Sequence, residues 1–334
     1  MQQNVITLAH GAGTRKSKEL IARTIEILGT TYIGQLEDSS KFNFSGKLAI
    51  TTDSFVVQPL FFSGGDIGKI AVCGTVNDLA VSGAQPLALS LALIIEEGLD
   101  FTTYDRIITS IRDSANIANV KIICGDTKVV GKGEADKIYI NTTGIGQIVT
   151  SPEPSMKRVV TGDVIILTHN IGDHVVSLLS AREGLGFDDV VRSDCASLNH
   201  VLLPILNHFG ENIHSVRDVT RGGVAAVLHE YSEEINKVIE VDLNRIPLSH
   251  HTRMATDMLD INPLYLANEG TACIFCSKEK SEDVLNFLQK FKETEQSCII
   301  GQVTEITGKD VYINNGDQNN LLPYQEDIML PRLC

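Results

Sequence analysis

The sequence predicts a protein of two α/β or α+β domains. Helical and strand patterns alternate in both halves of the 334-residue chain, which exceeds the length at which one hydrophobic core usually stops growing. A segment at 150–155 with two prolines and small polar residues separates the halves. We therefore expect one domain over residues 1–150, a second over 156–320 and an extended tail over 321–334.

The first half carries helical spacing over residues 15–28, where apolar residues fall on one face and a glycine follows the last turn. Further helices are expected over 64–82 and 104–118. Runs of apolar and β-branched residues predict the strands. These strands cover 47–52 and 55–57, on either side of a polar step, and then 87–96, 121–124 and 138–149.

The second half continues the alternation. Helices are expected over residues 172–182, 198–208 and 282–291, and another is opened by 216–223. Strands are expected over 164–167, 272–276, 297–303 and 310–313. Cys273 and Cys276 lie three apart on one of these strands and would point to opposite faces, so two buried structural cysteines are favoured over a metal site.

Composition excludes several classes of protein. The net charge of −14 argues against a partner made of nucleic acid or an anionic membrane. The N-terminus has neither the basic region nor the apolar core of a signal peptide, and the longest apolar run, at 87–95, is too short to span a bilayer. Seven cysteines without a disulfide-framework spacing favour reduced thiols and a cytoplasmic location.

Three aspartates in the first half stand where carboxylates can converge on a hard cation. Asp53 follows a strand and two threonines, and Asp126 follows the apolar strand at 121–124. Asp78 lies inside an otherwise apolar helix, where a charge is costly unless it is paired or bound to metal. Such oxygen ligands suit Mg²⁺, although each aspartate alone also fits a turn or a helix cap. Lys128 is either a phosphate-binding cation or a solvated turn lysine.

The glycine-rich stretches match neither a dinucleotide fingerprint nor a P-loop. In the second half, the run at 217–223 precedes a helix and suits either an anion or plain capping. Glu269, in an apolar neighbourhood before a strand, is a candidate general base or an ion-paired turn residue. Cys334 ends the chain after a stretch with no helical or alternating pattern, and is either a frayed end or a thiol that enters and leaves a cleft.

These stretches together resemble the HypE family of hydrogenase maturation factors. The matching runs are HGAG at 10–13, TTDSFVV at 51–57, GGDIGK at 64–69, VCGTVNDLA at 72–80, CGDTKVV at 124–130, NTTGIG at 141–146, RDVTRGG at 217–223, ANEG at 267–270 and PRLC at 331–334. The sequence departs from the family's usual residues at Thr14, Ser63, Val175 and Leu333. Of these, Thr14 bears on loop flexibility near the nucleotide.

The resemblance implies the two-domain PurM-like fold of aminoimidazole ribonucleotide synthetase, a flexible C-terminal tail and a homodimer formed through the N-terminal sheets. It also implies a reaction in which a carbamoyltransferase, HypF, loads the terminal thiol with a carbamoyl group from carbamoyl phosphate. ATP then drives dehydration of this thiocarbamate to a thiocyanate. The cyano group passes to iron on a HypC–HypD scaffold complex and becomes a ligand of the [NiFe] centre.

The same resemblance assigns roles to residues. Cys334 would carry the substrate, Glu269 would remove the amide proton and Lys128 would stabilise the transferring group. Mg²⁺ would be held by Asp53, Asp78 and Asp126. The implied ATP site comprises His10, Gly11, Gly13, Asp53, Gly65, Asp66, Lys69, Asn77, Asp78, Asp126 and Thr127.

Two other functions remain open at this point. A synthetase of the same superfamily that acts on a free small molecule would not need its last residue. A metal-binding or scaffold protein with Cys334 as a ligand would bind metal through the tail and consume no ATP.

Overall fold

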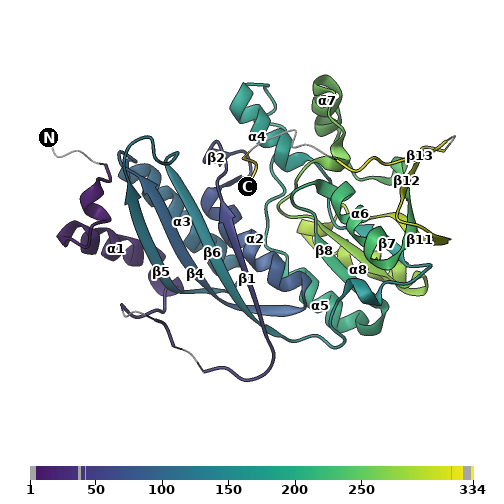
Figure 1. Cartoon of the computed structure of the whole chain (residues 1–334), viewed down its shortest axis with the longest axis horizontal. Coiled ribbons are helices and arrows are strands. Elements are labelled where there is room, and N and C mark those ends of the chain that lie inside the picture. Colours follow the sequence, from purple (N-terminus) through teal and green to yellow (C-terminus); the bar gives the residue numbers. More distant parts are fainter. Residues whose placement is uncertain (1–4, 37–38, 42, 317, 326–331) are drawn as a thin grey trace.

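The computed structural model describes residues 5–36, 39–41, 43–316, 318–325 and 332–334. It has two α/β lobes, each built on its own sheet, which lie side by side along the long axis of the molecule (Figure 1). The two-domain α/β prediction is confirmed. None of the helices in this part of the chain has the length and apolar character that crossing a membrane requires.

The first lobe contains a four-stranded sheet in the order β1-β6-β4-β5. Its strands are β1 (Leu48–Phe55), β4 (Ala84–Glu96), β5 (Lys121–Val130) and β6 (Ile138–Ile148), with a small hairpin of β2 (Phe61–Phe62) and β3 (Gly65–Asp66) beside them. Its helices are α1 (Arg15–Leu28), α2 (Ile67–Val81) and α3 (Phe101–Ile117). Helix α2 begins where the Asp66 side chain accepts hydrogen bonds from the first-turn amides of Gly68 and Lys69, so the expected helix start has a clear cap.

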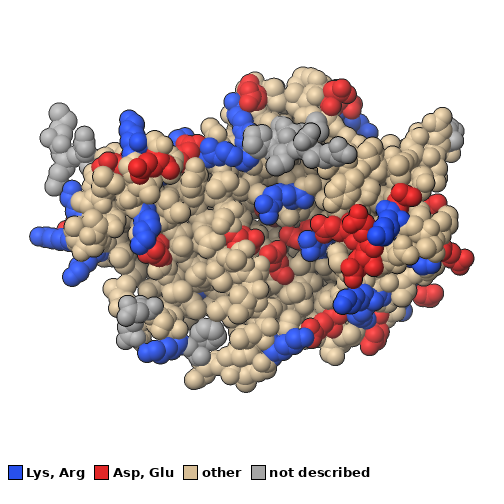
Figure 2. All heavy atoms as spheres, viewed as in Figure 1, with Lys and Arg blue, Asp and Glu red and all other residues tan. Residues whose placement is uncertain are grey.

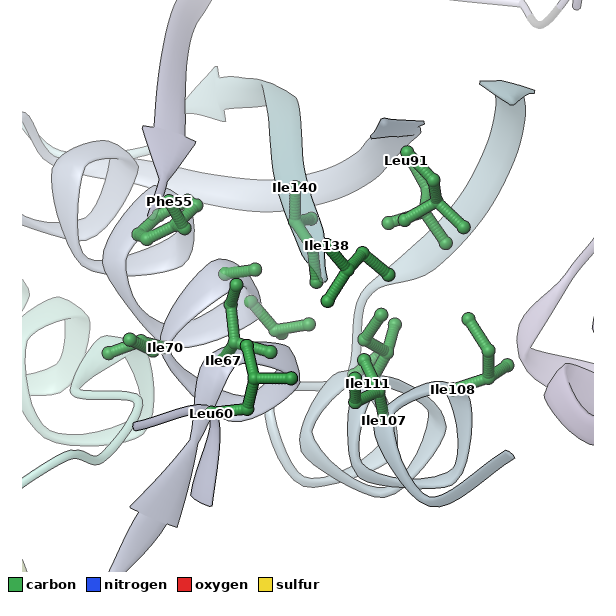
Figure 3. Packing of buried hydrophobic residues seen from close by; sticks show 14 of the residues in the cluster. Phe55, Leu60, Ile67, Ile70, Leu91, Ile107, Ile108, Ile111, Ile138 and Ile140 are labelled. Atoms are coloured by element: carbon green, nitrogen blue, oxygen red, sulfur yellow. The ribbon is translucent and has the colours of Figure 1, made fainter. Parts of the chain in front are cut away.

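Helices α2 and α3 cover one face of this sheet with a continuous apolar core (Figure 3). Ile67 and Ile70 of α2 are fully buried there, as are Ile107 and Ile111 of α3. The other face of the sheet is open. It exposes Leu48, Ile50 and Ile94, with Ile50 66% exposed, so among the described residues this apolar face has no covering layer.

The strands of this sheet are longer than the sequence predicts, and this changes where the aspartates lie. Strand β1 runs unbroken through the polar step, because residues 48–55 all pair in register with β6. Strand β5 likewise continues past Cys124 to Val130 beside β4. Asp53 and Asp126 are therefore within strands, which corrects the expectation that they follow strand ends.

The second lobe contains a seven-stranded sheet in the order β13-β12-β9-β11-β7-β10-β8, in which β12 and β9 are parallel. Its strands are β7 (Val164–Leu167), β8 (Ile213–Asp218), β9 (Lys237–Asp242), β10 (Ala272–Cys276), β11 (Cys298–Thr307), β12 (Val311–Asn314) and β13 (Asn319–Leu321). Its helices are α4 (Asp173–Glu183), α5 (Asn199–Phe209), α6 (Gly223–Ile235), α7 (His250–Leu259) and α8 (Ser281–Leu288).

Strand β10 is buried along its whole length. Cys273 packs in the core on one side of the sheet and Cys276 packs in the core on the other, and both thiols are free. This confirms the prediction of buried structural cysteines. Helix α7 is not among the elements expected from the sequence; Ser249 caps it by accepting a hydrogen bond from the Thr252 amide.

The two lobes are joined by polar contacts of α2. The Asn77 amide donates to the Ala196 carbonyl at 2.9 Å, and its oxygen accepts from the Leu198 amide at 2.7 Å. Asn77 is 3% exposed. A polar residue inside an apolar helix is thus explained by backbone groups of the second lobe that would otherwise be buried without partners.

Candidate active site

An open cavity of about 780 Å³ lies between the two lobes. In Figure 2 acidic and basic side chains gather around the hollow at the middle of the visible face. The cavity is lined by residues of β1, α2, β8 and the turn before α6, together with Glu269 and Cys334. Its chemically active side chains are Asp53, Asp78, Arg217, Asp218, Arg221, Glu269 and Cys334.

Asp53 and Asp78 are the two predicted metal ligands that the structure brings together. Thr75 donates to the Asp53 carboxylate at 3.0 Å, and Thr51 donates to the Asp78 carboxylate at 2.6 Å. Burial, and then the charge of Asp78, raises the pKa of Asp53. Two carboxylates that repel each other beside a cavity form a site where a cation would be stabilised.

Asp218 adds a third carboxylate at the end of β8. Burial, and then the charge of the neighbouring Asp78, raises its pKa to about 7. In the sequence this aspartate is indistinguishable from a helix cap, because strand β8 is itself absent from the expected elements. The apolar residues Ile213 and Val216 lie three apart, so no period-two alternation marks this strand in the sequence.

Glu269 is 4% exposed and lines the cavity. Burial, and then the charges of Asp194 and Asp218, raises its pKa well above the ordinary value for a glutamate. Its Oε1 atom has no hydrogen-bond partner among the described residues. This contradicts the alternative of an ion-paired turn residue, and leaves a carboxyl group whose free oxygen suits proton transfer.

The position of Glu269 is fixed by Asp194, a residue that the sequence did not single out. The Asp194 carboxylate accepts from the Glu269 amide at 3.0 Å and from the Gly270 amide at 2.9 Å. It also accepts from the Thr271 hydroxyl at 2.8 Å. One buried carboxylate thus holds three successive residues around the candidate base.

Cys334 lies inside the cavity because the end of the tail is docked. The Val56 amide donates to the Cys334 carbonyl at 3.0 Å, and the Gln58 amide donates to the Arg332 carbonyl at 3.4 Å. The Arg332 guanidinium donates to the Val56 carbonyl at 2.9 Å and pairs with Asp136 at 2.6 Å. The rest of the expected tail, including Pro331, lies partly outside the described residues.

The docked thiol is a poor nucleophile. Burial, and then the charge of Glu269, raises the pKa of Cys334 to about 12, with Arg221 opposing the shift. The thiol is therefore protonated at neutral pH in this position. The docked position is consequently unsuited to activating the sulfur as a nucleophile.

Asp126 and Lys128 are not in this cavity. They form an exposed pair at 3.4 Å on β5, at the sheet edge opposite β1. Three strand spacings separate β1 from β5, about 14 Å. Asp126 also pairs in register with Ala92 on the open face, whereas Asp53 faces α2. Within one chain Asp126 thus lies away from Asp53 and Asp78, and a metal site shared by all three stays a prediction.

The other expected nucleotide residues fall into two groups. His10, Gly11, Gly13 and Thr127 lie at or near the β5 edge, where a side chain on Gly11 would collide with the Val129 amide. The second group lies in or before α2 and is held by the chain itself. There Asp66 caps the helix, and Lys69 donates to the Gly64 carbonyl at 2.9 Å. A side chain on Gly65 would meet Phe62. Asn77 joins the two lobes.

The donor set in the cavity fits Mg²⁺ in kind, because Asp53, Asp78 and Asp218 offer carboxylate oxygens whose charges repel one another. Within the described ranges, however, no three His, Cys, Asp or Glu side chains are arranged to hold a metal ion by themselves. Phosphate oxygens are the usual additional ligands of Mg²⁺ in such sites.

Two family models match the chain. The N-terminal domain of AIR synthase related proteins matches residues 37–148, and the C-terminal domain of the same family matches residues 160–314. The chain is thus an AIR synthase related protein with the PurM-like fold.

Similar proteins place the chain in one family within the AIR synthase related proteins. The carbamoyl dehydratase HypE of Escherichia coli (strain K12) is 37% identical over 99% of this chain and 100% of its own length. A crystal structure of the hydrogenase maturation protein HypE in complex with ATP matches with a TM-score of 0.94 and 39% identity, over 98% of this chain and 99% of that one. A crystal structure of a HypE–HypF complex matches with a TM-score of 0.80 and 40% identity, over 83% of this chain and 90% of that one. The chain belongs to the HypE family of carbamoyl dehydratases.

Proposed function

We propose that this protein uses ATP to dehydrate an S-carbamoyl group on its own Cys334 to a thiocyanate. The product would supply the cyanide ligands of the iron in a [NiFe] hydrogenase during maturation. The observation that carries the proposal is that Cys334 and Glu269, far apart in sequence, line one cavity with Asp53 and Asp78. Its relatives' names, carbamoyl dehydratase and HypE in complex with ATP, support the reaction class.

The reaction has two steps. In the first, the carbamoyl oxygen attacks the γ-phosphorus of ATP, ADP leaves and one amide proton is lost, which converts a poor leaving group into a phosphate ester. In the second, Glu269 removes the remaining N–H proton as the C–O bond breaks and phosphate leaves, forming the C≡N bond. The raised pKa of Glu269 makes it a stronger base than an exposed glutamate.

Other cavity residues would bind the metal ion and stabilise negative charge. Asp53 and Asp78 would hold Mg²⁺, which supplies charge neutralisation at the phosphates, and Asp218 would join them. Arg221 lines the same cavity as Cys334 and is the residue best placed to meet negative charge there. The docked tail borders the cavity beside β1, where it would limit the access of water to a phosphorylated intermediate.

We propose a homodimer in which the open face of the first sheet meets the same face of a second copy. This face exposes Ile50 and Ile94, and it also carries Asp126 and Lys128. Ile50 lines the cavity as well, so a second copy here would border the site. This arrangement would bring Asp126 and Lys128 toward a neighbouring chain's nucleotide. His10, Gly11, Gly13 and Thr127 remain proposed nucleotide contacts at the β5 edge.

The partners follow from the chemistry and from a relative. HypF is proposed as the carbamoyl donor because a HypE–HypF complex is among the matching structures. A HypC–HypD complex is proposed as the cyanide acceptor. A cytoplasmic location fits the seven free thiols of the chain.

Intact-mass spectrometry with carbamoyl phosphate, HypF and MgATP tests the proposal. Cys334 should first gain a carbamoyl group and then lose one water only when ATP is present. A carbamoyl adduct that persists with ATP would refute the dehydration. Product formation from a free small molecule after removal of Cys334 would support the synthetase reading, and metal bound through the tail without ATP consumption would support the scaffold reading.

A further inference from the structure

His174 is a fully buried histidine that the proposed chemistry does not use. It lies in the first turn of α4, and both of its ring nitrogens have partners. Nε2 is 2.8 Å from the Leu333 carbonyl oxygen, and Nδ1 is 2.8 Å from the Ser193 hydroxyl. A residue of the second lobe therefore contacts the backbone of the tail one residue before the reactive cysteine.

The hydrogen-bond partners assign the proton on the ring. The Leu333 carbonyl can only accept, so Nε2 carries the hydrogen and donates it. Nδ1 then accepts from the Ser193 hydroxyl, whose oxygen in turn accepts from the Cys195 amide at 3.1 Å. Burial lowers the pKa of His174 despite the charge of Asp194, which agrees with a neutral ring.

The Leu333 side chain strengthens the same contact. It packs against the core of the first lobe and also against a second-lobe cluster that contains Val175 and Leu266. The ring of Phe62 meets His174 edge-on at 5.4 Å. The penultimate residue of the chain is thus held by its carbonyl and by its side chain between the two lobes.

His174 is also connected to the candidate base. Ser193 accepts the Cys195 amide and donates to His174, while Asp194 between them holds the amide of Glu269. The short segment Ser193–Cys195 therefore binds His174 through Ser193 and holds Glu269 through Asp194. When the tail leaves, the Nε2–H group of a fully buried ring loses its acceptor, and an unsatisfied buried donor is costly.

We propose that His174 is a positioning residue that holds the tail in the cavity through its neutral Nε2–H tautomer and, through Ser193–Cys195, keeps Glu269 set for the docked substrate. The role of His174 in positioning Glu269 rests on the proposed function. The role of His174 in docking the tail does not rest on it, because docking can be measured without ATP or a carbamoyl group.

The test is the rate at which iodoacetamide alkylates Cys334 in the full chain, followed by intact mass and peptide mapping. His174→Asn keeps an amide near Ser193 but is too short to reach Leu333, whereas His174→Gln places an amide donor near the Nε2 position. We expect about tenfold faster alkylation of Cys334 in H174N, the net value of one lost hydrogen bond. H174Q should lie within about threefold of the unmodified chain.

His214→Gln is the matched control. It perturbs a partly buried histidine on β8 of the same lobe, whose Nδ1 is 2.7 Å from Asp163. It should lower the melting temperature without changing Cys334 alkylation. Equal alkylation in H174N, H174Q and the unmodified chain would reduce His174 to a structural residue and overturn the proposal.

A measurement on the unmodified chain decides the matter if H174N does not fold. Nitrogen-15 NMR of the histidine ring should show a neutral Nε2–H tautomer whose proton exchanges slowly. A Nδ1–H tautomer, or rapid exchange of the Nε2 proton, would contradict the proposed contact. If the Nε2–H tautomer is observed but the carbamoylated chain is not dehydrated with MgATP, the proposed function fails while the docking inference stands.

Discussion

The amide of Val56 donates a hydrogen bond to the carbonyl of Cys334 at 3.0 Å, so the last residue of the chain extends the strand-like backbone that follows β1. This bond places the thiol beside Asp53, two residues beyond the start of the polar step at Thr51. The last residue of the chain is thereby held in the cavity.

Docking of the tail should weaken as the pH rises. The thiol has a pKa of about 12 when docked and about 8.5 when free, so the protonated form favours docking. The stabilisation is complete below about pH 8.5 and is lost as the pH rises toward 12, by up to about tenfold per pH unit. The protection factor of the Val56 amide, corrected for its intrinsic exchange rate, should fall accordingly. In Cys334→Ser it should stay flat over pH 8–10, and a parallel decline in that variant would rule out the thiol as the cause.

Glu269→Gln should accept the carbamoyl group but dehydrate it about 10²–10⁴-fold more slowly, because an amide cannot take the proton. Single-turnover mass spectrometry of the loaded chain measures this step directly. Glu19→Gln, which changes an exposed glutamate paired with Arg15 on α1, is the matched control and should dehydrate at the normal rate. Normal thiocyanate formation by E269Q would remove Glu269 from the role of base.

Asp218→Asn should stabilise the metal-free protein at pH 8. The folded state raises the pKa of Asp218 to about 7, so ionisation destabilises the fold as the pH rises from about 4 to 7. A shift of about three units corresponds to at most ~4 kcal/mol of gain at pH 8, and the gain should vanish near pH 4. Urea denaturation at both pH values measures the free energy of unfolding. Asp257→Asn, on the exposed side of α7, should show no such pH dependence, and equal gains at both pH values would refute the assigned cause.

Arg332→Ala should release the tail. The guanidinium holds the Val56 carbonyl and the Asp136 carboxylate, and these are hydrogen bonds with a charged donor in a partly buried place. Alkylation of Cys334 by iodoacetamide should speed up by about tenfold or more. Lys47→Ala, which breaks an exposed pair with Glu153 elsewhere on the first lobe, should leave the alkylation rate unchanged.

Ile50→Glu should disrupt the proposed homodimer by placing a charge in an apolar interface. Analytical ultracentrifugation should then show a monomer, and ATP-dependent dehydration should fall with it. Ile306→Glu changes an isoleucine that is 59% exposed on β11 of the other lobe and should remain dimeric. A monomeric unmodified chain that still dehydrates its thiocarbamate would contradict the dimer and its role.

Periodicity predicts most helices of this fold because their apolar faces and caps are local signals. The helix that Asp66 caps is predicted, because an apolar run follows its start. The helix that Ser249 caps is not predicted, because its sequence is polar. Strand limits were too short at β1 and β5, because polar residues on one face of a sheet interrupt the apolar pattern without interrupting the pairing.

The candidate site was only partly accessible to sequence reasoning. Glu269 and the pair Asp53 and Asp78 could be proposed from context, since polar groups in apolar surroundings are costly. That Asp126 lies at the far edge of the sheet depends on strand order, which no local pattern encodes. The same holds for His174, whose partner lies at the other end of the second lobe's sequence.

The tethered substrate has a kinetic consequence. A group carried on residue 334 cannot diffuse away, so its encounter with the cavity is a first-order event whose rate is independent of protein concentration. A covalently attached end competes with any outside protein at an effective concentration on the order of millimolar. A loading or receiving partner must therefore bind the segment Arg332–Cys334 more strongly than Val56, Asp136 and His174 do. The strength of this internal binding also sets the rate at which the cyano group is released for transfer.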